Sequence, residues 1–518
     1  MAASYLAKVY SAELVGVDAQ LIEIEIDINV GLHAFNIVGL ADRALNEAKE
    51  RVNSALKNSG TKPPNRENRK ITVNLAPADI KKTGSQYDLA IALGYLAATK
   101  QIRPFDSSGK MFVGELALDG RLRPIAGALN IAQLAVEKKI SQLFVPRENA
   151  AEAAVMEGVE VVPVGTLLES VEILEKRRAA RPARADGAAD TSSEETAGTT
   201  TPVPDISEII GQENAKRALM IAAAGGHNVL MVGPPGVGKS MLARALTGIL
   251  PDLDHSEGIE VMKIWSAAGL SPGRLMTRRP FRAPHQTISA AALVGGGSDP
   301  KPGEASLAHR GVLFLDELPE FPANALESLR DPMESGTIRI ARAKRAYSFP
   351  SRFSLIAAMN PCPCGYYGDA ERACACTAYE ILKYQRKISG PLLDRIDMQV
   401  KVGRIKVADL KNGESSREPA SPRIKALVRA ARLCQAKRFG ESATNAEMSS
   451  REAQDAARLT EGSERFLATL DRSRISPRGY YRILKVARTI ADIDSADRVS
   501  QEHLAEAFSY RLREAATF

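Results

Sequence analysis

Aromatic residues are scarce in this sequence of 518 residues, at 5% with a single tryptophan, and long apolar runs are missing. A membrane helix needs ~20 consecutive, largely uncharged apolar residues, and no stretch approaches that length. The opening MAASYLAKVYSAEL lacks the basic, apolar and small-residue succession of a secretory signal peptide. We therefore expect a cytoplasmic protein without a membrane partner.

Cysteine is also scarce, with five residues in the whole sequence. Four of them fall between positions 362 and 376, and Cys434 stands alone. In a cytoplasmic chain such a cluster indicates a metal site before it indicates disulfides. The composition is otherwise ordinary, with 44% hydrophobic and 25% charged residues, and the net charge of +7 fits a polyanionic partner without requiring one.

The run of residues 176–204, KRRAARPARADGAADTSSEETAGTTTPVP, contains almost no large apolar side chain. Such a segment cannot bury enough surface to offset its ordering entropy. We predict a flexible linker over residues 173–204, after an N-terminal domain of residues 1–172. Period-two alternation predicts a strand at residues 21–28 of that domain, and residues 88–98 read as a helix. Residues 111–125 read as a strand, an Asp-Gly turn and a second strand. This is a layered α/β or α+β domain.

The remainder of the chain divides into two patterns. Apolar strands alternate with helical segments over residues 205–405, which predicts a parallel sheet covered by helices. From about residue 421 every segment has helical periodicity, so residues 406–518 are expected to form an all-helical lid. The fold class is therefore α/β.

A phosphate-binding loop occupies positions 233–240, where GPPGVGKS is a complete G-x-x-x-x-G-K-S. It follows the apolar run NVLMV and precedes a helix, which is the context that the motif requires. Backbone N–H groups of such a loop surround phosphates, the lysine faces the β and γ phosphates, and the serine hydroxyl meets Mg²⁺. The predicted ATP-binding residues are Gly233, Pro234, Pro235, Gly236, Val237, Gly238, Lys239 and Ser240.

A second motif, VLFLDE, follows about 75 residues later. Four apolar residues carry Asp316 and Glu317 to the end of a predicted central strand. Asp316 would hold the Mg²⁺ environment, and Glu317 would orient or deprotonate the attacking water.

Six segments, the first beginning at residue 211 and the last at residue 388, carry a resemblance: GQENAKRAL, GPPGVGKS, FRAPHQTISAAALVGGG, KPGEASLAHRGVLFLDEL, AAMNPCPCG and ISGPLLDRIDMQV. They resemble the magnesium-chelatase-related branch of the AAA+ ATPases. Together with the N-terminal domain, they resemble most closely the ComM/YifB family of competence-associated proteins, over nearly the whole chain except the linker.

The resemblance implies roles for three further residues. Asn360 matches sensor 1, which helps to place the water, and Arg395 in LLDRID matches an arginine finger that reaches a neighbour's γ-phosphate. Arg478 matches sensor 2 on the lid, although both arginines could also be ordinary surface ion-pair residues. A finger that acts on a neighbour implies a ring, which we expect to be a homohexamer.

Two segments lie where the resembling DNA motors carry hairpins facing the central channel. Residues 283–306 are predicted to form a flexible loop. Residues 337–350, TIRIARAKRAYSFP, alternate around a turn and carry four cations for phosphate contact: Arg339, Arg342, Lys344 and Arg345. The alternative is a solvated basic hairpin.

The run SPGRLMTRRPFR, with Arg274, Arg278, Arg279 and Arg282, is equally compatible with nucleic-acid contact and with an exposed loop.

The cysteine cluster reads C-P-C, nine residues, then C-A-C. The thiolates of Cys362, Cys364, Cys374 and Cys376 could hold a tetrahedral, structural Zn²⁺. The C-x-C spacing departs from the common C-x₂₋₄-C, so four reduced cysteines in a loop remain the alternative.

The N-terminal domain resembles the proteolytic domain of Lon-type proteases (an S5-like α+β fold). Gln86 falls near the expected nucleophile position, next to Ser85, and Leu129 falls near the expected lysine. A Ser-Lys mechanism needs a base beside the nucleophile. We therefore interpret this domain as an inactive relative that serves assembly, DNA contact or partner binding.

The resulting prediction is a ring-forming, ATP-dependent motor on single-stranded or branched DNA. By resemblance, it would promote branch migration while incoming DNA is recombined during natural transformation. The alternatives are a motor subunit of a magnesium chelatase and a protein remodeller.

Overall fold

The structure is a computed structural model that describes residues 5–32, 34–40, 43–66, 68–183, 203–297, 300–342, 345–369, 371–405, 419–440, 443–470 and 475–511. The chain divides into two compact units. Unit 1 holds residues 1–197 and 258–276, and unit 2 holds residues 198–257 and 277–518.

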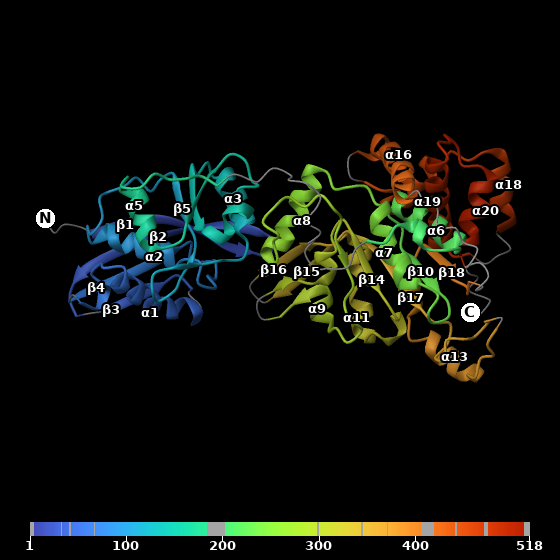
Figure 1. The fold of residues 1–518 in the computed structure, drawn as a ribbon, viewed down its shortest axis with the longest axis horizontal. Helices are drawn as coiled ribbons and strands as arrows, with labels where there is room; N and C mark the ends of the chain where they lie inside the picture. The colour runs from blue at the N-terminus through green and yellow to red at the C-terminus, as the bar shows by residue number, and fades with distance from the viewer. Residues whose placement is uncertain are drawn as a thin grey trace. The chain divides into compact units, whose positions relative to one another are not determined.

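Unit 1 is built on a seven-stranded mixed sheet with the strand order β3-β4-β2-β1-β5-β8-β9 (Figure 1). The strands are β1 (Tyr5–Val15), β2 (Asp18–Val30), β3 (Ala34–Val38), β4 (Arg69–Ala76), β5 (Lys110–Phe112), β8 (Gln142–Pro146) and β9 (Glu160–Val164). One apolar core joins one face of the sheet to α1 (Arg43–Asn58), α2 (Asp88–Ala98) and α5 (Leu167–Leu174). A second core joins the other face to α3 (Ala128–Glu137) and α4 (Ala150–Ala153).

The predicted α+β character of this unit is confirmed. The predicted strand at residues 21–28 lies within β2, where Ile22, Ile24 and Ile26 are buried and the residues between them are partly exposed. The predicted helix at residues 88–98 is α2. The Asp-Gly turn joins β6 (Glu115–Leu116) to β7 (Leu122–Arg123) in an antiparallel pair.

Residues 258–276 belong to unit 1, although the predicted domain boundaries placed them in the ATPase core at residues 205–405. They include most of α8 (His255–Ala267). The Ser266 carbonyl accepts a hydrogen bond from Gly127 N at 2.9 Å, and the Lys263 carbonyl accepts one from Asn130 Nδ2 at 3.1 Å. The start of the predicted linker also lies on unit 1, where Ala183 N donates to the Val161 carbonyl at 2.9 Å. Residues 184–202 of that linker lie outside the described residues.

Unit 2 is built on five parallel strands in the order β11-β14-β17-β10-β18 (Figure 1). They are β10 (Val229–Val232), β11 (Phe281–Arg282), β14 (Val312–Leu315), β17 (Ser354–Met359) and β18 (Met398–Lys401). β10 lies between β17 and β18 and is fully buried, as is typical of a parallel sheet with both faces covered. α6 (Glu213–Gly225) and α7 (Lys239–Ile249) pack against the sheet.

The predicted all-helical lid is confirmed for its described residues: α16 (Ser421–Phe439), α17 (Ser450–Ala457), α18 (Glu461–Leu470), α19 (Pro477–Ile493) and α20 (Gln501–Ser509). It shares one apolar core with the sheet, since Val486 and Ile490 of α19 belong to the same cluster as Val229 of β10.

Residues 283–306, predicted to form a flexible loop, contain regular elements. Their described part contains α9 (Ala290–Val294), the antiparallel pair β12 (Gly295–Gly296) and β13 (Lys301–Pro302), and α10 (Glu304–Leu307). The second predicted hairpin forms as β15 (Thr337–Arg342) and β16 (Arg345–Pro350). Short helices complete the unit: α11 (Ala323–Ser328), α12 (Arg330–Ser335), α13 (Ala378–Gln385) and α14 (Gly390–Leu393). Within the described ranges, every helix is too short or too polar to cross a bilayer.

Candidate functional site

The predicted phosphate loop connects the end of β10 to the start of α7. Gly233 N donates to the Met359 carbonyl of β17 at 3.2 Å, so the loop is anchored at the carboxyl end of the sheet. A Cβ atom at Gly233 would lie 2.1 Å from the Val402 carbonyl oxygen. Only glycine therefore lets the loop approach the backbone that follows β18.

Lys239 begins α7 and is almost completely buried. Its ammonium donates to the carbonyls of Gly233 at 2.6 Å and Pro234 at 2.8 Å, and to Asn360 Oδ1 at 3.0 Å. Burial lowers the pKa of Lys239 to about 8, and the carboxylates of Asp316 and Glu317 oppose part of that shift. Phosphate binding would supply the countercharge that this desolvated ammonium lacks.

Ser240 and Asp316 meet where Mg²⁺ is expected. The Ser240 hydroxyl donates to Asp316 Oδ2 at 2.7 Å. A hydroxyl and a carboxylate are both hard oxygen ligands, which Mg²⁺ prefers, so the donor set fits that ion. The structure thus brings together Lys239, Ser240, Asp316 and Asn360, which lie far apart in the sequence.

Glu317 has a backbone conformation that the sequence did not indicate. Its φ of 52° and ψ of 48° lie in the left-handed region, which a residue with a Cβ atom rarely adopts. Its amide donates to Asp316 Oδ1 at 3.0 Å. Strain of this kind, of order 1–3 kcal/mol, is concentrated at functional sites. No local pattern in the sequence could have predicted it, since it arises where β14 ends at the turn into the helix Leu318–Glu320.

Arg395 lies near the amino-terminal ends of the strands of the same sheet. It precedes β18, and its carbonyl accepts a hydrogen bond at 3.1 Å from Asn228 Nδ2, just before β10. The strands are parallel, so their amino-terminal ends together form one side of the sheet, the amino edge. The phosphate loop follows the side formed by their carboxyl-terminal ends, the carboxyl edge. Four residues of strand, about 13 Å, separate the two edges. We infer that Arg395 does not reach the phosphate loop of its own subunit.

Arg395 is also held within its own subunit rather than extended as a finger. The residue is only 6% exposed, and its guanidinium donates to the carbonyls of Arg330 at 3.0 Å and Pro391 at 2.8 Å. Nη2 lies 2.7 Å from Glu334 Oε1. The Arg478 guanidinium lies 3.8 Å from the same Glu334 oxygen and is 61% exposed. The two guanidinium groups therefore share one carboxylate.

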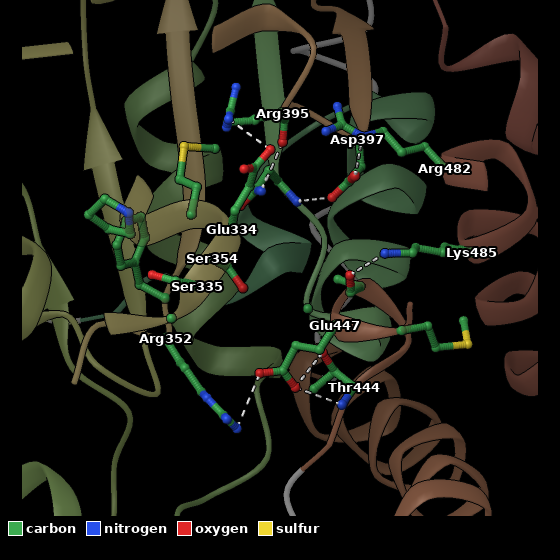
Figure 2. Close-up of a pocket in the computed structure, with 18 of the residues that line it drawn as sticks. Glu334, Ser335, Arg352, Ser354, Arg395, Asp397, Thr444, Glu447, Arg482 and Lys485 are labelled. Atoms are coloured by element: carbon green, nitrogen blue, oxygen red, sulfur yellow. Dashed lines mark hydrogen bonds and ion pairs between the residues drawn. The ribbon is translucent and has the colours of Figure 1, made fainter. Parts of the chain in front are cut away.

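These two arginines line a cavity of about 750 Å³ within unit 2 (Figure 2). Its lining carries eight cations and four carboxylates. Figure 2 shows Arg395 beside Glu334, Arg352 paired with Glu447, and Arg482 and Lys485 from α19 facing the same space. The lining cations are Arg279, Arg310, Arg352, Arg395, Arg432, Arg478, Arg482 and Lys485, and the acids are Glu257, Glu334, Asp397 and Glu447.

Burial perturbs several of these cations. Desolvation lowers the pKa of Arg432 to about 9, with Arg279 nearby adding to the effect, and desolvation also lowers the pKa of Lys485 and of Arg482. Arg432 donates to the Ala223 carbonyl and Lys485 to the Ala446 carbonyl. Arg482 donates to the Ile396 carbonyl and lies 3.6 Å from Asp397 Oδ1. The cavity therefore has an excess of incompletely compensated positive charge and is suited to an anion.

Two arginines of the run at residues 271–282 are committed to structural ion pairs. Arg279 Nη2 lies 2.7 Å from Glu257 Oε2, and Arg282 donates two hydrogen bonds to Glu304, at 2.6 and 2.7 Å. Both arginines are largely buried, so neither is a freely exposed loop residue. Sequence reasoning missed these pairs because the carboxylates lie about 22 positions away.

The predicted DNA-contacting hairpin is described in part. Arg339 of β15 is exposed. The backbones of Arg342 and Arg345 pair with each other at the end of the hairpin, but their side chains and the whole of Lys344 lie outside the described residues.

The four clustered cysteines converge, as the sequence predicted. Their sulfur atoms all lie within 4.8 Å of one another. Cys362 Sγ lies 3.4 Å from Cys364 Sγ and 3.7 Å from Cys374 Sγ. These separations exclude disulfides, whose sulfurs lie ~2.05 Å apart. They approach the ~3.8 Å edge of a tetrahedron with 2.3 Å metal–sulfur bonds, so the residues fit a metal ion.

The region predicted to resemble a Lon-type active site holds a carboxylate beside its serine. The Ser85 hydroxyl donates to Glu115, and Gln86 Nε2 donates to Glu13 Oε2 at 3.0 Å. Leu129, at the position expected for lysine, is completely buried. These contacts do not assemble a Ser-Lys dyad from the predicted positions.

The fold and the site define a P-loop protein of the AAA+ type, with the phosphate loop, the acidic strand end and the polar sensor on one parallel sheet. Residues 205–410 match the family described as magnesium chelatase, subunit ChlI, and residues 418–511 match the C-terminal part of that subunit. Residues 24–149 match the family described as subunit ChlI of Mg-chelatase.

Full-length relatives specify the family further. The chain is 43% identical over 515 residues to competence protein ComM of Haemophilus influenzae, covering 98% of this chain and 97% of the relative. It is 41% identical over 513 residues to the protein YifB of Escherichia coli, with the same coverage. The magnesium-chelatase 38 kDa subunit of Rhodobacter capsulatus is 30% identical over 181 residues, 31% of this chain and 51% of that subunit. The chain belongs to the ComM/YifB family.

Proposed function

We propose that this protein is a ring-forming ATPase that moves on DNA and promotes branch migration when incoming single-stranded DNA is recombined. The observation that carries ATP hydrolysis is the convergence of Lys239, Ser240, Asp316 and Asn360 at one edge of the sheet. The name of the Haemophilus relative supports a role in competence.

The residues at the carboxyl edge have separate tasks in hydrolysis. Lys239 draws the β and γ phosphates into the loop, and Ser240 and Asp316 would hold Mg²⁺, which neutralises phosphate charge when bound. Glu317 orients the attacking water and accepts its proton, while Asn360 hydrogen-bonds the water or the phosphate that it attacks. The buried lysine favours the charge that gathers in the transition state.

The second half of the site comes from a neighbouring subunit. Arg395 and Arg478 share Glu334 at the amino edge of the sheet, away from the phosphate loop of their own chain. A neighbour's γ-phosphate would compete for the two guanidinium groups and release them from Glu334. This arrangement supports a closed ring, which we propose to be a homohexamer.

DNA contact is assigned to the β15–β16 hairpin. Arg339, Arg342, Lys344 and Arg345 would neutralise phosphates of a strand without reading its sequence. We also propose Zn²⁺ as the ion held by the four cysteines, because an all-thiolate, tetrahedral site is typical of structural zinc.

The test is steady-state ATP hydrolysis by the purified protein with single-stranded, duplex and branched DNA, with Lys239→Ala as the control. We expect stimulation by single-stranded or branched DNA that disappears in the Lys239→Ala protein. ATP turnover that is indifferent to all three DNA forms would sink the DNA motor. Metal insertion into a porphyrin with a partner subunit would then be the next activity to assay.

A further inference from the structure

The cysteine loop touches the phosphate loop. Gly365 lies between Cys364 and Cys374 in the sequence and is buried. A Cβ atom at Gly365 would lie 2.6 Å from Pro235 Cδ and 3.9 Å from Asn360 Cγ. The backbone of the cysteine loop therefore packs against the second proline of the phosphate loop, next to the predicted sensor.

A second set of contacts involves α13 and Lys387, which follow the cysteine loop in the sequence. Gln385 Nε2 of α13 donates to the Pro361 carbonyl at 3.0 Å, one residue after Asn360. Lys387 Nζ lies 3.1 Å from Glu320 Oε1, just beyond Glu317. Tyr384 of α13 is buried between these groups, and burial together with Glu320 and Glu317 raises its pKa to about 12. The segment from Pro361 to Lys387 thus contacts the phosphate loop through Gly365 and the short helix after Glu317 through Lys387.

The loop lacks regular secondary structure, and its internal contacts are a few turn hydrogen bonds and a cluster around Asp369 and Tyr366. Residues 361–369 and 371–377 contain no helix or strand, and most of them are exposed or partly exposed. A segment of this length without secondary structure loses considerable entropy on ordering, and a cross-link that closes it removes much of that cost. The four cysteines can supply this cross-link by binding one metal ion. Backbone amides already donate to three of their sulfur atoms at 3.3–3.4 Å, from Tyr367, Cys364 and Cys376.

We propose that a metal ion on the four cysteines is a positioning element of the nucleotide site. By closing the loop, it fixes Gly365 against Pro235 and Asn360, so metal occupancy sets nucleotide affinity and turnover. Zinc is the ion of choice for the four-thiolate set. This inference rests on the proposed ATPase function, and it makes Gly365 a positioning residue that contacts no substrate.

Two glycines of the loop form a matched pair for the test. Gly365 and Gly368 both have positive φ, of 85° and 75°, so alanine imposes similar backbone strain at each. A Cβ atom at Gly368 meets nothing within 4 Å, whereas one at Gly365 meets Pro235. Full-length Gly365→Ala and Gly368→Ala proteins would be compared for zinc content, fluorescent ATP-analogue affinity, kcat and Tm.

We expect both variants to retain zinc and similar Tm values. Gly365→Ala should lose about ten- to a hundredfold in kcat/KM, the scale of a small misplacement of binding groups, while Gly368→Ala stays close to wild type. Equal losses, or no loss in either variant, would overturn the inference.

Metal removal gives an independent readout. Zinc would be stripped from the wild-type protein with a chelator and then restored, with hydrogen exchange of residues 233–240 and analogue affinity measured in each state. We expect faster exchange and weaker binding without zinc, both reversed on its return. Wild-type protein that takes up no zinc, or binds nucleotide equally in both states, contradicts the inference. Zinc-loaded protein that neither binds nor hydrolyses ATP contradicts the proposed function instead.

Discussion

At the scale of single residues, Lys239 is expected to carry the charge on which nucleotide binding depends. Burial lowers its pKa to about 8, so above that pH the free protein has largely released the proton. Bound phosphates favour the charged form and raise the pKa again. ATP binding at about pH 9 should therefore take up more than half a proton, and binding near pH 7 very little.

This linkage is measured by calorimetry of ATP binding in buffers with different ionisation enthalpies. The Lys239→Met protein is the control, since it has no group to take up the proton. Equal proton uptake at both pH values in the wild-type protein would contradict the assignment of the shifted group.

Glu317 is expected to act on the water and not on nucleotide affinity. Substitution by glutamine keeps its size but removes the base, so kcat should fall by about a hundredfold or more. The dissociation constant of a fluorescent ATP analogue should change by less than about threefold, near the scale of a surface change. A parallel loss of affinity and turnover would assign Glu317 to binding instead.

At the scale of elements, the β15–β16 hairpin carries a prediction of its own. Substituting Arg339, Arg342, Lys344 and Arg345 by glutamine should weaken binding of single-stranded DNA. The slope of log affinity against log salt is negative, and its magnitude should decrease by ~0.7 for each lost phosphate contact. Fluorescence anisotropy with labelled DNA over a salt series measures both quantities.

A triple variant on α16 provides the control, with Arg423, Arg429 and Lys437 changed to glutamine. These side chains are exposed and basic but lie on a helix with no proposed DNA role. If both variants lose affinity to the same extent, general surface charge and not the hairpin accounts for binding.

The elements that the sequence predicted are those with a local signature. Residues 88–98 form the predicted helix because apolar spacing is a property of consecutive residues, and GPPGVGKS predicts its loop for the same reason. The placement of residues 258–276 in unit 1 was missed, since it depends on contacts with residues more than 130 positions away.

The candidate site also has features that local motifs predict and features that depend on tertiary packing. Convergence of Lys239, Asp316 and Asn360 follows from parallel strands that end at one edge, so the motifs predict it. The inward contacts of Arg395, the conformation of Glu317 and the packing of Gly365 on Pro235 arise from tertiary packing, for which no local pattern exists.

At the scale of the whole molecule, a site shared between subunits predicts complementation. Lys239→Ala removes the phosphate contact of a subunit but leaves its Arg395 intact, and Arg395→Ala does the reverse. Each variant alone should have little turnover. Rings formed from an equal mixture should recover about a quarter of wild-type turnover, because a quarter of neighbouring pairs then combine both intact halves.

The measurement compares ATP turnover of the separate and mixed proteins after subunit exchange, with the assembly state checked by light scattering. Mixed rings that are no more active than the separate variants would place Arg395 outside its neighbour's site.

If ATP hydrolysis by this protein moves DNA, as we propose, a branch-migration assay should detect the movement. A labelled strand in a branched junction would be followed with wild-type protein and with Glu317→Gln, each with ATP or a non-hydrolysable analogue. We expect strand release only by the wild-type protein with ATP. Vigorous ATP hydrolysis on the same junction without strand release would contradict it.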